Sequence, residues 1–225
     1  LLLKPEGTVT FEFPHLLKML REGQFDTIYH EHFSYLSLLA VERVFARHGL
    51  EVYGVQEIPT HGGSLRVYAR QKGAPVSDKT LEGTRDKVRA DEAAAGLDTL
   101  VPYRTFRSVP ATRKCDLLGF LIDARRKGKT VVGYGAPAKG NTMLNYCGVG
   151  PELLPFTTDL SAAKQGMYLP GVNIPVKSPA EIDAARPDYV LILPWNLRDE
   201  ISAQMAPIRG WGGRFVVAMP ALETF

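Results

Sequence analysis

The sequence predicts an α/β protein whose C-terminal part forms a parallel, Rossmann-like sheet. Three observations support this fold class. Single helix patterns alternate with strand patterns after residue 129, the stretch 189–193 is apolar throughout, and 45% of the residues are hydrophobic against 23% charged. Single helices between strands are typical of parallel sheets, and an unbroken apolar run is typical of a strand buried on both faces. The composition excludes disordered and fibrous classes.

The first 75 residues are expected to mix strands and helices. Val9, Phe11 and Phe13 alternate with polar residues, which predicts a strand. Ser37 is a suitable N-cap before apolar residues at helical spacing, and Gly49 is a suitable helix stop. The predicted elements are, in order, a strand ending at residue 14, helices over 15–21 and 37–49, and strands over 51–58 and 64–68.

The rest of the chain is expected to begin with a helical connector, because residues 72–110 are polar and contain a helix-favouring stretch. An amphipathic helix follows and ends before Gly128. Ser178 and Glu181 have the spacing of a capping box. The predicted elements are strands over 130–135, 156–159, 189–193 and 215–218, with helices beginning near residues 137, 178 and 197. These patterns divide the chain into three segments, residues 1–75, 76–128 and 129–225.

Charge and cysteine content limit the possible partners. Lys and Arg number 27 against 24 Asp and Glu, giving a net charge of +3 that is scattered along the chain. No nucleic-acid or membrane partner is therefore expected. No apolar run is long enough to span a bilayer, and a cytoplasmic location is the expectation. Cys115 and Cys147 fit neither a disulfide framework nor a zinc cluster, so both are expected to be buried small hydrophobes.

A glycine-rich loop follows the first strand of the predicted C-terminal sheet. The segment Gly133–Gly140 has the spacing G-x-G-x-x-A, and Asp159 ends the next strand, where a ribose-binding carboxylate is expected. Asn196 follows a neighbouring strand. The pattern predicts binding of an anion or nucleotide, although glycines that only let a helix pack on a strand would look the same. The candidate contacts are Gly133, Gly135, Lys139, Asn141, Asp159 and Asn196.

Four acid/base side chains follow one another in Tyr29-His30-Glu31-His32. A phenol, two imidazoles and a carboxylate are groups that transfer protons, so this segment is the candidate catalytic site. An extended backbone would place Tyr29 beside Glu31, whereas a helical turn would place Tyr29 beside His32. A zinc site would need a third ligand at suitable spacing, and no metal is expected.

A second polar turn, Thr60-His61-Gly62-Gly63-Ser64-Leu65-Arg66, supplies a hydroxyl, an imidazole, backbone amides and a guanidinium. Its glycines permit a tight turn or a close approach to a ligand. A glycine-rich hairpin with an incidental histidine is the equal alternative. His30, His61 and Arg66 are added to the candidate substrate-binding residues.

Three segments, residues 25–35, 60–66 and 133–147, together resemble the sugar C-methyltransferase family. Leu3-Lys4-Pro5-Glu6-Gly7 resembles the loop that enters the fifth strand of a class I methyltransferase dependent on S-adenosylmethionine. The resemblance implies methylation of a carbon beside the ketone of a nucleoside-diphosphate keto-deoxysugar. It also implies an incomplete class I methyltransferase lobe, a helical connector and a Rossmann-like domain. The main S-adenosylmethionine-binding motif of the family is absent from this chain.

The resemblance also implies roles for the candidate catalytic residues. His32 is the leading candidate base, because a neutral imidazole is available near neutral pH. Tyr29 could donate a hydrogen bond to the developing enolate oxygen, and Glu31 could orient or share the proton.

Two other classes of function fit the same residues. The glycine loop with Asp159 also suits an oxidoreductase that uses a nicotinamide cofactor, although the acid/base segment precedes the expected cofactor domain. A nucleotide or sugar-nucleotide binding module without catalysis is the third possibility.

Overall fold

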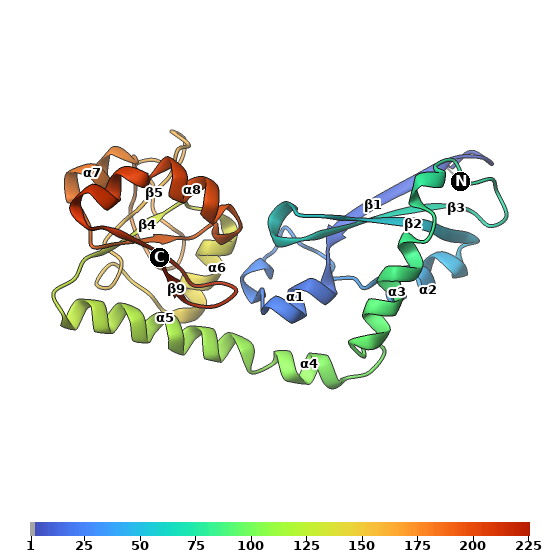
Figure 1. Cartoon of the computed structure of the whole chain (residues 1–225), viewed down its shortest axis with the longest axis horizontal. Coiled ribbons are helices and arrows are strands. Elements are labelled where there is room, and N and C mark those ends of the chain that lie inside the picture. The colour runs from blue at the N-terminus through green and yellow to red at the C-terminus, as the bar shows by residue number, and fades with distance from the viewer. Residues whose placement is uncertain (1–2) are drawn as a thin grey trace. The chain divides into compact units, whose positions relative to one another are not determined.

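The computed structural model describes residues 3–225 and confirms the α/β fold class. The chain forms two compact units. The first comprises the residues up to Glu22 together with Glu31–Arg107, and the second comprises Gly23–His30 together with Ser108–Phe225. The chain therefore enters the second unit for one short segment, returns to the first, and then completes the second (Figure 1).

The first unit contains a three-stranded antiparallel sheet in the order β1-β3-β2. Its strands are β1 (Thr8–Pro14), β2 (Leu50–Ile58) and β3 (Ser64–Gln71), and its helices are α1 (Leu16–Glu22), α2 (Leu38–Arg47), α3 (Thr84–Ala94) and α4 (Val101–Phe106). Short 3-10 turns lie at Thr60–Gly62 and Lys79–Leu81. The strands and helices predicted for the first 75 residues are confirmed, and the N-cap is formed by Ser37, whose hydroxyl accepts a hydrogen bond from the Ala40 amide.

The core of the first unit lies between this sheet and the helices α2 and α3. Leu65, Val67 and Ala69 of β3 are fully buried, as the two-residue period of a strand requires. The opposite face carries Arg66 and Arg70, which pair with glutamates on the neighbouring strands. One face of the sheet is thus apolar and packed, and the other is charged.

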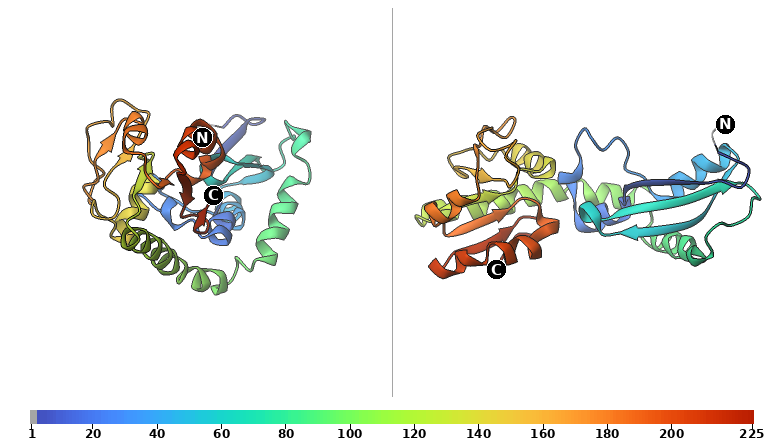
Figure 2. Two further views of the ribbon diagram at one scale, coloured as in Figure 1. Left: turned by 60° about the vertical axis from the view of Figure 1, so that its left-hand side comes forward. Right: turned by 90° about the horizontal axis from the view of Figure 1, so that it is seen from above.

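The second unit contains a six-stranded sheet in the order β6-β5-β4-β7-β8-β9. The strands are β4 (Val131–Tyr134), β5 (Thr157–Thr158), β6 (Val176–Lys177), β7 (Tyr189–Ile192), β8 (Arg214–Val217) and β9 (Glu223–Thr224). The first five are parallel, and β9 is antiparallel to β8. The helices are α5 (Val109–Arg126), α6 (Ala138–Cys147), α7 (Ala180–Ala185) and α8 (Arg198–Gln204), and helices lie on both sides of the sheet (Figure 2). Further 3-10 turns lie at Phe25–Thr27, Trp195–Leu197 and Ala206–Trp211.

The order in which strands are added to the sheet reverses at β4. From β4 the chain proceeds to β5 and β6 on one side, and it then crosses to β7 and β8 on the other. In open parallel sheets of this kind, ligands bind outside the carboxyl ends of the strands at the point where the order reverses. The loops after β4 and β7 therefore border the expected ligand crevice of this unit.

Several details differ from the sequence predictions. Strands β6 and β9 were not predicted, because each has two residues and, unlike the equally short β5, neither was marked as a strand by its surrounding sequence. The expected capping box does not form, since α7 has Pro179 at its N-cap and no side-chain cap, while Glu181 pairs with Lys177 instead. Cys147 is buried as expected, whereas the prediction for Cys115 is wrong, because this thiol lies on an exposed face of α5.

Within residues 3–225, no helix is long and apolar enough to cross a bilayer.

Candidate functional site

The glycines of the loop after β4 are packed against neighbouring protein atoms. A Cβ atom on Gly133, which lies within β4, would meet Thr157 of β5 at 2.6 Å. Gly135 has a φ of +87° and a Cβ there would lie 2.5 Å from the Pro194 ring. These two glycines allow neighbouring strands and loops to approach closely, so the packing explanation accounts for them without a ligand.

Asp159 binds the same loop from the end of β5. Its Oδ2 accepts a hydrogen bond of 2.8 Å from the Ala136 amide, and its Oδ1 accepts one of 2.9 Å from the Ser161 amide. Lys164 lies 3.3 Å from Oδ2. Burial raises the pKa of Asp159, but the two amides and Lys164 outweigh it, so the pKa lies below its usual value. The ionised carboxylate therefore occupies a loop amide that an anion would otherwise use.

Lys139 and Asn196, which were predicted separately, meet in the crevice. Lys139 lies in the first turn of α6 and is almost fully buried, and its Nζ donates a 2.8 Å hydrogen bond to Asn196 Oδ1. The same ammonium lies 4.9 Å from the centre of the Trp195 ring. Asn141, two residues further along α6, accepts hydrogen bonds from the Asn145 side chain.

Asp26, which the sequence analysis did not select, completes this cluster. Its side chain is fully buried, and Oδ2 accepts a 2.7 Å hydrogen bond from the indole nitrogen of Trp195. The turn Phe25–Thr27 packs against α6, where the Phe25 and Tyr146 rings are 5.1 Å apart. A segment of the chain itself therefore contacts the loops that border the crevice.

The pKa values of the two charged groups in this cluster, Asp26 and Lys139, are both shifted. Burial raises the pKa of Asp26 to about 6, although the hydrogen bond from Trp195 and the charge of Lys139 act in the opposite direction. Burial lowers the pKa of Lys139, and the charge of Asp26 partly opposes that change. Both shifts follow from removing charged groups from water.

The predicted catalytic segment begins directly after this turn. Residues 29–31 form a bend and a turn, and residues 32–35 have no regular structure, so the segment is neither a strand nor a helix over its length. The side chains of His30 and Glu31 are exposed, whereas Tyr29 and His32 are half-buried. The rings of His32 and Tyr35 are 6.3 Å apart. Tyr29 and His30 belong to the second unit, and Glu31 and His32 belong to the first.

The predicted turn at residues 60–66 lies in the first unit. His61 is exposed and has a positive φ of 56°, which is uncommon for a residue other than glycine. Arg66 donates two hydrogen bonds to Glu12 across the β1–β3 pair, at 3.1 and 2.8 Å. A substrate anion at Arg66 would have to compete with this carboxylate.

A buried histidine that the sequence analysis did not select lies beside this turn. His15 is 5% exposed, and its Nδ1 lies 3.9 Å from Glu57. Two hollows of about 190 Å³ share His15, Lys18 and Glu57, and one of them extends to Gly63 and Ser64 of the turn. Burial is the main cause that lowers the pKa of His15, so its imidazole is neutral at neutral pH.

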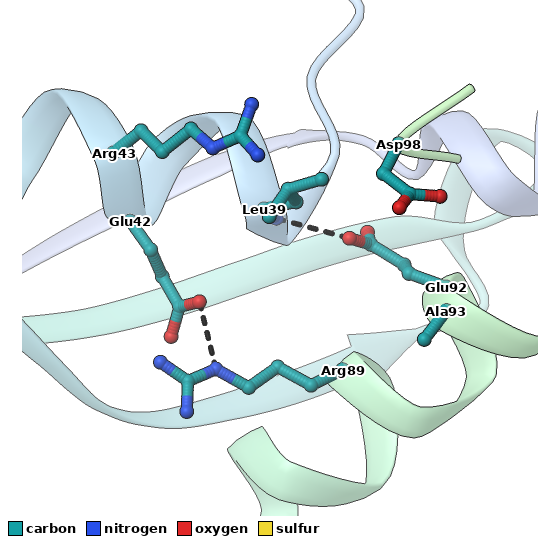
Figure 3. A pocket seen from close by; sticks show the side chains of 7 residues that line it. All are labelled: Leu39, Glu42, Arg43, Arg89, Glu92, Ala93 and Asp98. Carbon is teal, nitrogen blue, oxygen red and sulfur yellow. Dashed lines mark hydrogen bonds and ion pairs between the residues drawn. The ribbon is translucent and has the colours of Figure 1, made fainter. Parts of the chain in front are cut away.

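A larger hollow of about 360 Å³ lies between α2 and α3, and none of the predicted site residues lines it (Figure 3). Arg89 and Glu42 form an ion pair across it at 2.8 Å. Glu92 accepts hydrogen bonds from the Leu38 and Leu39 amides at 2.7 and 2.9 Å, and so caps the start of α2. The polar residues that line this hollow hold α2 and α3 together, which indicates a structural role.

The predicted site residues therefore fall in three places. In the second unit, Lys139 and Asn196 contact each other and Asp159 binds the loop after β4, whereas Gly133 lies within β4 and Asn141 is bound by Asn145. His61 and Arg66 lie in the first unit. Of residues 29–32, the first two belong to the second unit and the last two belong to the first unit. Asp26 and His15 were not selected because the partners that each contacts, Trp195 and Glu57, lie far away in the sequence and form no spacing pattern with them. Over the described residues, 3–225, no group of three or more potential ligands could hold a metal ion.

Comparison with known proteins agrees with the resemblance seen in the sequence. The family model described as the C-methyltransferase C-terminal domain matches residues 59–220. The C-methyltransferase NovU of Streptomyces niveus is 38% identical over 219 residues, which cover 97% of this chain and 51% of that protein. The chain thus spans about half the length of this relative. Because the family model matches most of its residues, the chain belongs to the C-methyltransferase family.

Proposed function

We propose that the chain is part of a C-methyltransferase that acts on a nucleoside-diphosphate keto-deoxysugar. Family membership supports the reaction class. The observation that carries the proposal further is the segment Tyr29–His32, where four proton-transferring side chains lie on an irregular stretch. His30 and Glu31 are exposed, and Tyr29 and His32 are partly exposed. Such groups suit the removal of a proton beside a ketone.

In this proposal, His32 removes the proton from the carbon beside the sugar ketone. A neutral imidazole can accept a proton near neutral pH. Tyr29 donates a hydrogen bond to the ketone oxygen as negative charge develops on it, which stabilises the enolate. Glu31 orients the imidazole or shares the proton. The enolate carbon is then the nucleophile that C-methylation requires.

The resemblance names S-adenosylmethionine as the methyl donor, and the glycine loop at residues 133–140 does not fit it. The spaces beside Gly133 and Gly135 are filled by Thr157 and Pro194. The Ala136 amide is bound to Asp159. The same packing disfavours a nicotinamide dinucleotide at this loop. The contribution that we propose for this chain therefore ends with formation of the enolate.

The predicted diphosphate contact at Gly133–Gly140 stays a prediction that can be tested at Asp159. If a diphosphate binds this loop, it must displace the carboxylate from the Ala136 amide. An Asp159→Asn variant would then bind thymidine diphosphate more tightly in a calorimetric titration. If Asp159 instead holds the ribose, the same variant would bind more weakly. Unchanged binding would remove both roles, and competition by NADH would favour the oxidoreductase alternative.

The catalytic assignment is tested by His32→Asn in the complete protein, with methyl transfer to the keto-sugar nucleotide as the assay. The variant is expected to lose turnover by about 100-fold or more, the size of a general-base contribution, and to retain nucleotide binding. His48→Asn is the control, because His48 is exposed at the end of α2, outside the segment. Full activity of the His32 variant would overturn the assignment. Binding without turnover in every form would favour the non-catalytic module.

A further inference from the structure

Asp26, Lys139 and Trp195 are buried, and with the half-buried Asn196 they form a cluster that takes no part in the proposed proton removal. It lies at the carboxyl ends of β4 and β7, where the strand order reverses. A sheet of this kind ordinarily receives its ligand there. Here the turn Phe25–Thr27 packs against α6 and places a fully buried carboxylate against the loop that follows β7.

The turn is held by several independent contacts. Asp26 accepts the 2.7 Å hydrogen bond from Trp195, and the positive charge of Lys139 acts on the same carboxylate. Phe25 packs on Tyr146 at 5.1 Å. Within the turn, the Thr27 hydroxyl donates to the Gln24 carbonyl at 2.8 Å. Charge, hydrogen bonding and ring packing thus fix one short piece of backbone in one place.

Fixing this turn restricts the segment that follows it. Tyr29 lies three residues after Asp26, and His32 lies six residues after it. With consecutive Cα atoms about 3.8 Å apart, Tyr29 can lie no more than about 11 Å from Asp26, and His32 no more than about 23 Å. The Ile28 amide shortens this range further, because it donates a 3.0 Å hydrogen bond to the Phe25 carbonyl.

We propose that Asp26 is a positioning residue, and that the crevice of the Rossmann-like unit is a docking site for the chain's own residues 23–30. Docking through Trp195 fixes where the acid/base segment begins. The second unit thereby holds Tyr29 and His30, with which the catalytic segment begins. This inference rests on the proposed function of Tyr29, Glu31 and His32, but docking itself is measurable without turnover.

Docking is tested by hydrogen–deuterium exchange of the peptide that spans residues 23–30. Asp26→Ala and Trp195→Phe each remove one partner of the buried hydrogen bond, and we expect exchange to quicken about tenfold or more. Asp26→Asn keeps an oxygen that can accept from Trp195, so exchange within about threefold of the parent chain is expected. Unchanged exchange in both Asp26→Ala and Trp195→Phe would overturn the proposal.

Two matched variants control for general loss of stability. Trp211→Phe removes the other indole donor of the second unit, which binds the Pro187 carbonyl at 3.0 Å. Asp188→Asn alters a carboxylate that accepts from the Thr130 amide at the opposite, amino ends of β4 and β7. Neither variant is expected to change exchange over residues 23–30. An equal increase in the controls would mean that the effect is not local, and would overturn the proposal.

Positioning is tested by kinetics in the complete protein. Asp26→Ala is expected to lower kcat about tenfold or more with little change in the KM for the methyl donor, and Asp26→Asn is expected to restore most of kcat. Faster exchange with unchanged kcat would overturn the positioning role. If His32→Asn retains full activity while exchange responds as expected, the proposed catalytic function fails and the docking stands.

Discussion

Asp26→Asn is expected to change the pH dependence of stability, because it removes a buried group whose pKa is shifted. Burial raises the pKa of Asp26 from 3.8 to about 6 in the folded chain. The folded state therefore binds the proton more tightly than the unfolded state, and the stability of the parent chain falls as pH rises through this window. A shift of about 2.2 units at 1.36 kcal/mol each corresponds to about 3 kcal/mol. Asn has no carboxyl group to ionise, so the free energy of unfolding of the variant does not fall for this reason as pH rises.

The assay is urea unfolding of the parent chain and the variant at several pH values. About 1.4 kcal/mol of the difference falls between about pH 5 and about pH 7.5, where most proteins can be measured. Over that range, the unfolding free energy of Asp26→Asn relative to the parent chain should rise by about this amount. The rest of the stability difference of about 3 kcal/mol develops below about pH 5, mostly between the two pKa values.

Asp188→Asn serves as the control for this measurement. Hydrogen bonds from Lys129 and the Thr130 amide lower the pKa of Asp188, so its contribution is lost only at acidic pH. Its stability difference from the parent chain should be constant between about pH 5 and about pH 7.5. The reasoning is refuted if the Asp26→Asn difference is also constant over that range, or if it falls as pH rises.

Three further predictions concern packing and reactivity. Gly135→Ala should lower the free energy of unfolding in urea by about 1–3 kcal/mol more than Gly212→Ala. Both positions have a positive φ, but only at Gly135 would the new methyl group meet the Pro194 ring. Equal losses would contradict the packing explanation. Cys115 should react with a thiol reagent in the folded chain while Cys147, whose burial raises its pKa to about 11, stays protected; equal rates would contradict this. Glu92→Gln should cost about 1–2 kcal/mol in thermal unfolding, because it weakens the cap on α2; an unchanged transition would contradict this.

Most of the fold could be predicted from local patterns. The alternation of Leu65, Val67 and Ala69 with arginine and tyrosine residues defines β3 and its buried face. Ser37 and Gly49 mark the limits of α2 through cap chemistry. Strands β6 and β9 could not be predicted, because each is defined by pairing with a neighbouring strand and not by a pattern of its own.

The candidate site was less predictable, because its contacts join residues far apart in the sequence. The hydrogen bond between Asp26 and Trp195 spans 169 positions, and no spacing in the sequence relates the two residues. The glycine loop shows the opposite difficulty. Its spacing suits a nucleotide, yet the spaces beside Gly133 and Gly135 are filled by protein atoms. A spacing pattern alone does not distinguish a backbone that approaches a ligand from one that approaches another strand.

The most direct test of the proposed catalytic segment is exchange of the sugar's α-proton in heavy water. The complete protein is incubated with the keto-sugar nucleotide and no methyl donor, and deuterium incorporation is followed by mass spectrometry. Enolate formation by this segment predicts exchange in the parent protein, slower exchange in Tyr29→Phe, and exchange reduced about 100-fold or more in His32→Asn. Exchange at the parent rate in His32→Asn would contradict the assignment of the base.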